Sequence, residues 1–461
     1  MHIKIFQIFI TIFLLVTNVN ATSLKESIEQ VVSANSEIIA EHFNKKAYRA
    51  DIKLQEADYY PTVDFSTNIK KENKTEQMDS SSTTSDTDLY GWNANVKIEQ
   101  LVYDGKKTSN NIKQYTHKYN TIKYKSNQRI EDLVFDTIKI YTTLVSYQEL
   151  IAMDEFKIKV HEKYLQLAKE KEEISGERLD VYQVSSKIKT IIDHFLEQEV
   201  NQQKAFSQYI RLTSTKLNNN ICRPIIDETT IPSTLEKTIS IALKNSNKVL
   251  AQKEIIKEKI MTMNSQSSNF KPTIKLTAEV DWDSDIKLED NGETKTYNIG
   301  LRSNWNLYNG GKDKITMQKN KIYVLEEKKI LDTIEEEVIA DTKGAYNTYY
   351  KLKKRIENIK SHILDNKAIV DINNRQLQDG TKIFLDLLNA ESELFRTKIL
   401  LINTEFLLFD EYYNILKNLD ILSDTILKSN DQVCQKYIFN EPILKLQKQT
   451  EDELSNELGL E

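Results

Sequence analysis

The first candidates for chemistry in this 461-residue chain are polar side chains near a Gly-Thr pair. Lys382, Asp386 and Asn389 all lie in the segment DGTKIFLDLLNAESELF, and Asp180 lies in an earlier segment of similar pattern. Such carboxylates can serve as general acids or bases, bind a metal, or line an ion path. Taken alone, Asp386 is best interpreted as a solvated carboxylate on a helix face.

No arrangement typical of an enzyme accompanies these residues. The six histidines lack metal-ligand spacing, and no phosphate-binding loop, nucleophile elbow or paired-cysteine motif occurs. The acidic run Glu335–Glu337 is typical of a solvated helix face. We therefore expect no enzymatic activity, no metal and no cofactor. Lys and Arg number 63 against 69 Asp and Glu, for a net charge of −6, which argues against a nucleic-acid partner.

The composition favours long helices exposed to solvent. The chain has only 10 glycines and 5 prolines in 461 residues, whereas roughly 7% and 5% are usual. Charged residues of both signs reach 29%. Few turn formers and abundant mixed charge are typical of extended helical proteins.

The N-terminal residues 1–21 have the pattern of a secretory signal peptide. A lysine precedes an apolar run from Ile5 to Val16, and Val19 and Ala21 fit a small-residue cleavage site. An uncleaved anchor is the alternative, but a span needs about 20 apolar residues. We expect the mature chain to begin near Thr22.

Two cysteines occur, Cys222 and Cys434. In an exported chain they could form a disulfide that ties the middle of the chain to its C-terminal region. Two free thiols are the alternative, and the sequence leaves both open.

The chain is a tandem repeat. The segment VYDGKKTSNNIKQY echoes LYNGGKDKITMQKN, and Gly105 and Gly310 are 310 − 105 = 205 positions apart. Two further pairs of segments recur in the same order at offsets of 206 and 211. The predicted parts are a first repeat at 22–217 (strands about 62–70 and 92–103, hairpin about 105–213), a linker at 218–233, a second repeat at 234–422 (strands about 272–282 and 296–308, hairpin about 311–420) and a polar tail at 423–461.

Each repeat is expected to contain a helix, two strands and two very long helices. All four predicted strands alternate apolar and polar residues with period two, and each is about ten residues, the length of a tilted membrane strand. Aromatic residues near the strand ends favour a membrane barrel over a soluble sandwich, because such barrels carry aromatic girdles at both interfaces. The residues expected at the membrane interface are Trp92, Trp282, Trp305, Tyr103 and Tyr308.

Four strands cannot close a barrel. Every backbone N–H and C=O in lipid must be paired, so an open sheet is excluded there and the strands must associate between copies. Two copies would give eight strands and a filled interior, whereas three would give twelve strands and an open lumen.

The helical segments are long and carry coiled-coil spacing. Roughly 70 residues at about 1.5 Å each would reach about 100 Å. Apolar residues from Ala345 to Ile363 step by 4 and 3 positions, and a similar series from Ile130 to Leu144 is interrupted at Gln148. At each far end a glycine and a short polar run allow the chain to turn back as an antiparallel hairpin. Gly105, Gly310 and Gly311 stand where strand becomes helix, since glycine's wide φ range allows a change of direction.

Together these features resemble the TolC family of outer-membrane channel proteins over nearly the whole mature chain. The resemblance rests on YDG, on LYNGG and on DGTKIFLDLLNAESELF, which is similar to the family's G-T-x-x-x-x-D-x-L-D-A tip. It implies a mainly α fold with a membrane β-barrel part, in which a homotrimer forms a twelve-stranded barrel on a periplasmic helical tunnel. It also implies outer-membrane lipid, a periplasmic adaptor and an inner-membrane transporter (RND, ABC or MFS type) as partners.

The resemblance gives the tip residues a role as a periplasmic gate. Asp386 matches the first of the family's paired aspartates, and Asn389 stands at the second, so the ring carries about half the expected charge. Carboxylates converging on an axis would attract cations and repel one another. The resemblance also suggests a tie from Asp180 to a neighbouring tip, for example to Lys382. Leu377 replaces the family's tip tyrosine, so the closed-state bonding is expected to differ.

A periplasmic coiled-coil adaptor or stalk protein is the rival interpretation. Adaptors carry one long hairpin but lack amphipathic strand pairs placed twice beside two hairpins. Within the channel interpretation, small-molecule efflux and type I protein secretion both remain open, as do the resting state and the cargo.

Overall fold

The computed structural model describes residues 22–77, 84–216, 221–284, 292–379 and 381–428. The chain divides into two compact units, each described by itself below. The hairpin unit comprises Met1–Ser36, Ile130–Ile239 and Asp341–Glu461, and the sheet unit comprises Glu37–Arg129 and Ser240–Ala340. Two long helices, α3 (Lys107–Ser175) and α7 (Lys312–Gln378), contribute residues to both units.

The order of elements repeats along the chain. The first series is α1 (Leu24–Ala34), α2 (Ser36–Ala57), β1 (Thr62–Gln77), β2 (Thr84–Tyr103), α3 and α4 (Leu179–Thr213). The second series is α5 (Leu235–Asn245), α6 (Asn247–Gln266), β3 (Thr273–Ser284), β4 (Glu293–Asn304), α7 and α8 (Phe384–Asn418). The 3₁₀ turns η1 (Glu228–Thr230) and η2 (Ser267–Phe270) and the helix α9 (Leu422–Lys428) complete the described elements.

Each repeat begins with two helices rather than the single predicted one. Asn35 separates α1 from α2 with an extended backbone, and its side-chain amide donates to the carbonyl of Leu212 at 2.9 Å. Ser246 separates α5 from α6 and caps the latter by accepting a hydrogen bond from the N–H of Val249. Short polar residues of this kind compete with helical hydrogen bonds, which explains the break.

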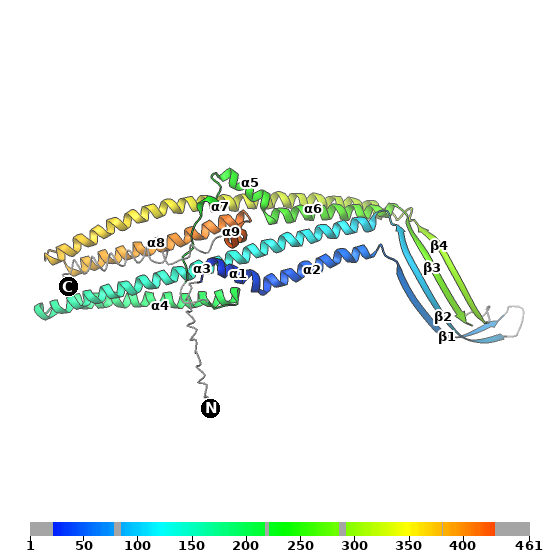
Figure 1. The fold of residues 1–461 in the computed structure, drawn as a ribbon, viewed down its shortest axis with the longest axis horizontal. Helices are drawn as coiled ribbons and strands as arrows, with labels where there is room; N and C mark the ends of the chain where they lie inside the picture. The colour runs from blue at the N-terminus through cyan, green and yellow to red at the C-terminus, as the bar shows by residue number, and fades with distance from the viewer. Residues whose placement is uncertain (1–21, 78–83, 217–220, 285–291, 380, 429–461) are drawn as a thin grey trace, which may run out of the picture. The chain divides into compact units, whose positions relative to one another are not determined.

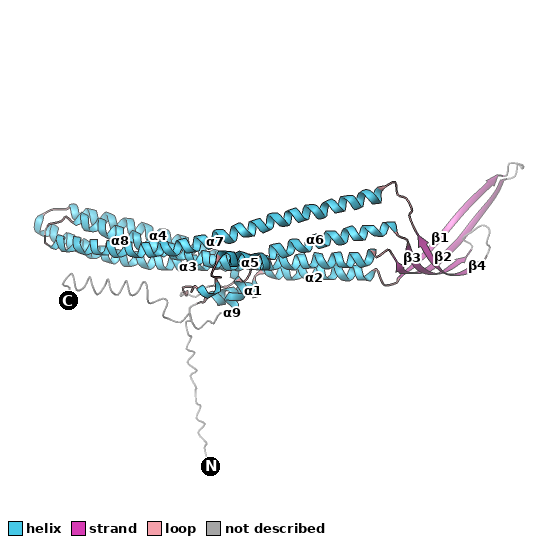
Figure 2. Ribbon diagram, turned by 90° about the horizontal axis from the view of Figure 1, so that it is seen from above, coloured by secondary structure: helices cyan, strands magenta, loops and turns pink. Residues whose placement is uncertain are grey.

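The strands form one antiparallel sheet in the order β1-β2-β3-β4 (Figure 2). The first and last strands pair on one side only within the described residues, so the sheet has two outer edges. β1 and β2 are longer than predicted, and β2 begins at Thr84 rather than near 92. β4 ends at Asn304 rather than near 308.

The register gathers the apolar residues of all four strands on one face of the sheet. Phe65 lies opposite Val96, Val96 opposite Val280, and Val280 opposite Tyr297. The same face includes Ile69, Ile98, Leu276, Trp282, Ile299 and Leu301, all exposed. A broad exposed apolar face of this kind indicates that something other than water covers it.

The opposite face of the sheet is polar and internally bonded. The amide of Asn95 donates to Glu279 at 2.8 Å and also to Asp281. Glu99 accepts from Lys97 at 2.8 Å and from Lys275 at 3.0 Å. Strict alternation across four strands thus separates an apolar surface from a hydrated one.

The predicted interface aromatics lie at two levels of the sheet. Trp92 contacts Trp282 with ring centroids 5.9 Å apart, and it pairs with Ser284, the last residue of β3. Because β2 begins earlier than predicted, Trp92 lies within that strand but at the end of its four-stranded part. Tyr103 ends β2, whereas Trp305 and Tyr308 follow β4 in the connection to α7.

The three predicted hinge glycines all have positive φ, namely 70° at Gly105, 58° at Gly310 and 77° at Gly311. Asp104, just before Gly105, caps the N-terminus of α3. Its carboxylate accepts hydrogen bonds from the N–H groups of Lys107 at 3.0 Å and Thr108 at 2.6 Å, the first two residues of the helix. This is an N-terminal cap, so the short sequence Asp-Gly supplies both the bend and the helix start.

The hairpin unit consists mainly of two antiparallel hairpins, α3–α4 and α7–α8, whose turns lie at the same end of the unit (Figures 1 and 2). The predicted coiled-coil seams are buried. Val134, Tyr141 and Leu144 are fully buried in α3, and Tyr349 and Ile359 are nearly so in α7. Apolar residues stepping by 4 and 3 positions therefore form the core of this unit.

Some sequence predictions fall beyond the described residues. The signal peptide at 1–21 and most of the tail, from 429 to 461, lie outside the described part of the chain, as does Cys434. The beginning of the predicted tail contains the helix α9. In the segments that the structure describes, no helix is both long and apolar enough to cross a bilayer.

Replacing Gly105 with alanine is expected to destabilise the protein. A Cβ there would lie 3.0 Å from Cβ of Lys271 and 3.1 Å from Cβ of Ser268, on a backbone of positive φ. Strain and crowding together should cost roughly 1–3 kcal/mol of unfolding free energy.

The matched control is Gly344→Ala, because Gly344 lies inside α7 and, apart from the helix's own nearby backbone, nothing in the described structure comes within 4 Å of the added Cβ. It should be neutral or gain up to about 1 kcal/mol. Thermal unfolding of the detergent-extracted protein, followed by circular dichroism, measures both. Equal unfolding midpoints for the two variants would contradict the strain argument.

Candidate channel gate and the helices that position it

The second hairpin tip holds three of the predicted gate residues. α7 ends at Gln378, and Gln376 accepts hydrogen bonds at its carbonyl from the N–H groups of Thr381 at 2.9 Å and Lys382 at 3.2 Å. The Lys382 ammonium lies 3.7 Å from a carboxylate oxygen of Asp386, one helical turn on. Asp386 is about half exposed, with its side chain 40% accessible, and Asn389 is exposed. The tip therefore presents a carboxylate and an amide to solvent.

The first hairpin tip is more tightly bonded. Gly176 turns the chain with a φ of 75°. Asp180 accepts a hydrogen bond from Lys171 of its own hairpin at 2.7 Å, and this bond raises the pKa of the lysine. Within the single chain, Asp180 is thus paired with Lys171, and Lys382 is paired with Asp386.

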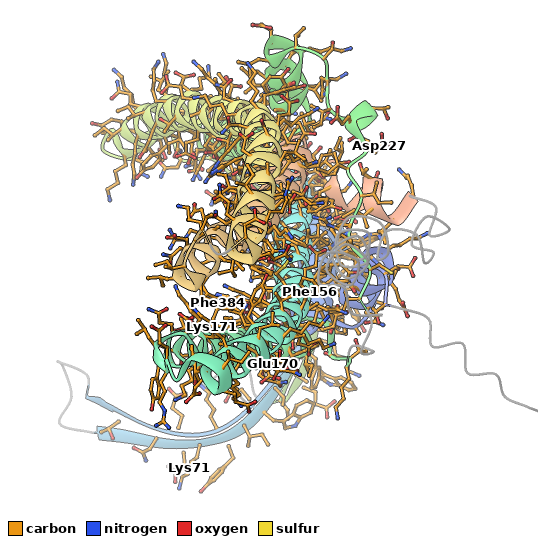
Figure 3. All side chains as sticks on the ribbon, turned by 90° about the vertical axis from the view of Figure 1, so that its left-hand side faces the viewer. Lys71, Phe156, Glu170, Lys171, Asp227 and Phe384 are labelled. Carbon is orange, nitrogen blue, oxygen red and sulfur yellow. The ribbon has the colours of Figure 1, made fainter. Side chains whose placement is uncertain are left out.

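A layer of buried rings beneath the tips joins the two hairpins. Phe384, the first residue of α8, packs edge-on against Tyr164 of α3 with centroids 5.9 Å apart. Phe395 of α8 contacts Phe156 at 6.3 Å and His161 at 6.4 Å. Figure 3 labels Phe156 and Phe384, both of which are buried. These contacts fix the start of α8 and hence the position of Asp386 two residues further on.

Two ionisable groups lie within this ring layer. Glu391 is buried and accepts a hydrogen bond from the Tyr164 hydroxyl at 3.1 Å, while burial raises its pKa. Burial lowers the pKa of His161 to about 4, so the imidazole is neutral at physiological pH. The layer is therefore polar in part, and the ammonium groups of Lys157 and Lys398 lie over the Phe395 ring, 5.1 and 5.4 Å from its centroid.

The linker between the repeats is held by charge further along the hairpin unit. Arg223 lies 3.4 Å from a carboxylate oxygen of Glu149 on α3, and it also pairs with Glu405 on α8. Its guanidinium lies over the rings of Phe406 and Phe409, 5.3 and 5.5 Å from their centroids. All three charged groups are largely buried. One linker residue thus bridges both hairpins.

Tyrosine hydroxyls hold the rest of the linker against the second hairpin. Tyr349 of α7 donates to Glu228 at 3.4 Å, and Lys353 binds the same carboxylate oxygen at 2.6 Å. Tyr412 of α8 donates to the carbonyl of Asp227 at 3.3 Å. Burial first, and then the nearby Glu228 carboxylate, raise the pKa of Tyr349 far above its usual value.

Three carboxylates of the hairpin unit are buried enough to titrate near neutrality. Burial raises the pKa of Glu131 to about 7, although the Ser423 N–H donates to it at 3.2 Å. Burial also raises the pKa of Glu149 to about 7, against the attraction of Arg223. The same cause raises the pKa of Asp410 to about 6. The sequence analysis did not identify any of the three. One signal was present, because the apolar 4,3 series of the first long helix is interrupted at Gln148, next to Glu149.

No group of three or more His, Cys, Asp or Glu residues suited to a metal ion occurs among the residues that the structure describes. The features that the structure does bring together are an amphipathic four-stranded sheet, paired long hairpins and a charged tip. This combination defines a helical duct with a membrane-facing β segment.

Comparison with known proteins places the chain in a family. The family described as outer membrane efflux protein matches residues 27–188 and 238–408, which is one match in each repeat. The chain belongs to the outer membrane efflux protein family. It is therefore a passive exit duct in the outer membrane, with a helical tunnel in the periplasm, and not an enzyme. Members of this family work with a periplasmic adaptor and an inner-membrane transporter.

Individual relatives agree with this assignment. The outer membrane efflux protein BepC of Brucella suis biovar 1 (strain 1330) is 19% identical over 365 residues, which cover 77% of this chain and 78% of BepC. The CmeC outer membrane channel of Campylobacter jejuni matches the fold with a TM-score of 0.75 at 14% identity, covering 88% of this chain and 87% of CmeC. The outer membrane protein VceC of Vibrio cholerae matches at 0.73 and 15% identity, covering 86% and 96%.

The buried Glu131 predicts a specific pH dependence of stability. Its pKa is about 7 in the fold against 4.5 in an ordinary setting, so the folded state binds more protons between these values. Stability should therefore fall as pH rises through this window, by at most about 3 kcal/mol for this group. Glu131→Gln stays neutral at every pH and still accepts the Ser423 hydrogen bond, so it should lose less stability between pH 5 and pH 8.

The measurement is the unfolding midpoint in urea at both pH values, in detergent. Glu393→Gln is the control, because Glu393 is a partly exposed carboxylate whose side chain is 46% accessible. Parallel pH profiles for Glu131→Gln and the wild type would show that Glu131 does not carry the effect.

Proposed function

We propose that three copies of this chain close a twelve-stranded barrel in the outer membrane, with the apolar sheet face toward lipid and the polar face toward the lumen. The outer edges of β1 and β4 support this, because each strand pairs on one side only in the described chain. Pairing β4 of one copy with β1 of the next removes every free edge, as lipid requires. Three copies rather than two leave room for an aqueous lumen.

An unpartnered row on α4 also supports association between copies. Ile192, Leu196 and Val200 follow one another at four-residue spacing and are 40%, 51% and 55% exposed. Ile188 and Ile191 on the same helix are buried in the hairpin unit. A second apolar row on a helix already packed on one side is typical of a helix that packs against another copy.

Neighbouring residues of β4 test the orientation of the sheet. Ile299 lies on the apolar face and Asn298 on the polar face. Ile299→Asp should abolish recovery of a detergent-extractable trimer from outer membranes, because a carboxylate would then face hydrocarbon in every copy. Asn298→Asp should leave the trimer intact, since it faces water. Equal recovery of both variants as trimers would contradict the proposed orientation.

We further propose that Asp386 sets the charge of a constricted mouth at the helix tips. The half-exposed carboxylate and its partner Lys382 support this, because neither is committed to the core. The ring layer under Phe384 holds the start of α8 in place, which fixes the backbone position from which the Asp386 side chain extends. Asn389 adds an uncharged acceptor and donor at the next helical turn.

Conductance of the reconstituted channel tests this role. Asp386→Asn removes three carboxylates from a trimer, so the concentration of divalent cation that blocks half the current should rise about tenfold or more. Lys382→Gln removes the neighbouring positive charge and should lower that concentration. Asp379→Asn, in the turn before the tip helix, is the control and should have little effect. Identical block in Asp386→Asn and the wild type would remove Asp386 from the gate.

We propose small-molecule efflux as the main role. The assignment of BepC as an outer membrane efflux protein supports this. Type I protein secretion would use the same duct with another transporter, and the transporter class (RND, ABC or MFS) sets the cargo. Co-purification of the crosslinked native complex identifies that transporter. A transporter dedicated to protein export would favour secretion instead.

A further inference from the structure

A groove of about 730 Å³ lies on the hairpin unit where the linker meets the end of α8 and the short helix α9. Cys222, Ile225, Leu416 and Ile426 are among its lining residues. Ile225 is 45% exposed in this groove, whereas Cys222 is 7% exposed. Pockets that bury a drug-sized ligand have volumes of roughly 300–1,000 Å³, and the volume of this groove falls within that range. The larger part of the exposed lining is apolar, with Lys25, Arg223, Asp227, Asp424 and Lys428 also in it, so the groove is suited to a peptide segment that carries both apolar and polar side chains.

The described chain ends at the wall of this groove. Lys428, the last residue of α9 and the last described residue of the chain, is one of the residues that line it. The sequence that follows is SNDQVCQKYIFNEP, in which Cys434 comes six positions after Lys428. Six residues can span up to about 20 Å. Cys434 is therefore within reach of Cys222, and no third cysteine competes for it in the sequence.

The tail sequence matches the groove in character. Val433 precedes Cys434, and the run Tyr437–Phe439 follows it, after which the chain becomes strongly polar. A short apolar stretch placed next to a cysteine fits an apolar groove with a cysteine in its wall. The groove would bury those side chains, and the stretch would cover Ile225.

We propose that residues 433–439 of the chain's own C-terminal tail fill this groove, with Cys434 bonded to Cys222. The periplasm is an oxidising compartment in which such bonds persist. The bond forms by exchange with the disulfide of a periplasmic thiol oxidant. The two thiols give up two protons and two electrons, and the oxidant is reduced to a dithiol.

The disulfide would fix the linker next to the residue that bridges the two hairpins. Cys222 is adjacent to Arg223, which bridges Glu149 of α3 and Glu405 of α8. The Tyr141 hydroxyl of α3 also lies 2.7 Å from the Cys222 carbonyl and 2.9 Å from the Thr22 carbonyl. The docked tail would therefore hold the linker, Thr22 and both hairpins together.

The first experiment maps the bond in the full-length protein, isolated from outer membranes without reductant and alkylated before digestion. We expect one peptide that joins Cys222 to Cys434 within a single chain, lost on reduction. Alkylation of both cysteines would overturn the proposal. A bond between two copies, seen as a covalent dimer, would also overturn it and would assign the groove to a second chain.

The second experiment tests docking separately from the bond, by hydrogen exchange of the groove residues 221–226 and 412–428. Truncation after Lys428 should speed their exchange at least tenfold. Truncation after Leu446, which removes only the polar end, is the matched control and should leave exchange unchanged. Cys434→Ser should have an intermediate effect, because the apolar run remains. Equal exchange in both truncations would overturn docking, whereas the trimer and the channel would be unaffected.

Discussion

Unpaired backbone groups at the edges of the sheet are the constraint on which the rest of this molecule depends. In hydrocarbon each unpaired N–H or C=O costs several kcal/mol. Among the residues that the structure describes, β1 and β4 each present such an edge, and in a bilayer the summed cost would exceed the roughly 5–15 kcal/mol that stabilises a typical domain. A single copy of the sheet therefore cannot remain in the bilayer. In the proposed membrane orientation of the sheet, insertion would therefore be coupled to association between copies.

The duplication gives two hairpins of similar length but different tips. At the first tip, Asp180 is bonded to Lys171 at 2.7 Å and its side chain is only 15% accessible. At the second tip, the Lys382–Asp386 pair is longer, at 3.7 Å, and about half exposed. An exposed pair one helical turn apart contributes only about 0.3–0.5 kcal/mol. Of the two tip aspartates, Asp386 of the second repeat is thus the more exposed and the more loosely paired.

Much of this fold could be predicted from the sequence, because alternation in Val63–Ile69 or Thr273–Trp282 and the 4,3 spacing after Ala345 are local patterns that burial enforces. Strand ends were less accurate: β2 begins at Thr84, since hydrogen bonding continues past the apolar residues that signalled the strand. The break at Asn35 depends on a carbonyl 177 positions away. Arg223 and Glu131 were missed for the same reason, since their partners come from other repeats or from α9.

The ion pairs of the hairpin unit differ in how much free energy is needed to separate them. Arg223 is hydrogen-bonded to Glu405 and lies 3.4 Å from Glu149, and all three groups are largely shielded from water. Separating such a buried group from its partner costs roughly 3–5 kcal/mol, because the remaining charge stays desolvated. Separating the exposed Lys382–Asp386 pair at the tip, by contrast, costs little free energy, because water solvates both charged groups. Any rearrangement of the two hairpins that opens the tips should therefore bend the helices between the Arg223 bridge and the ring layer, while the linker continues to hold α3 and α8 together.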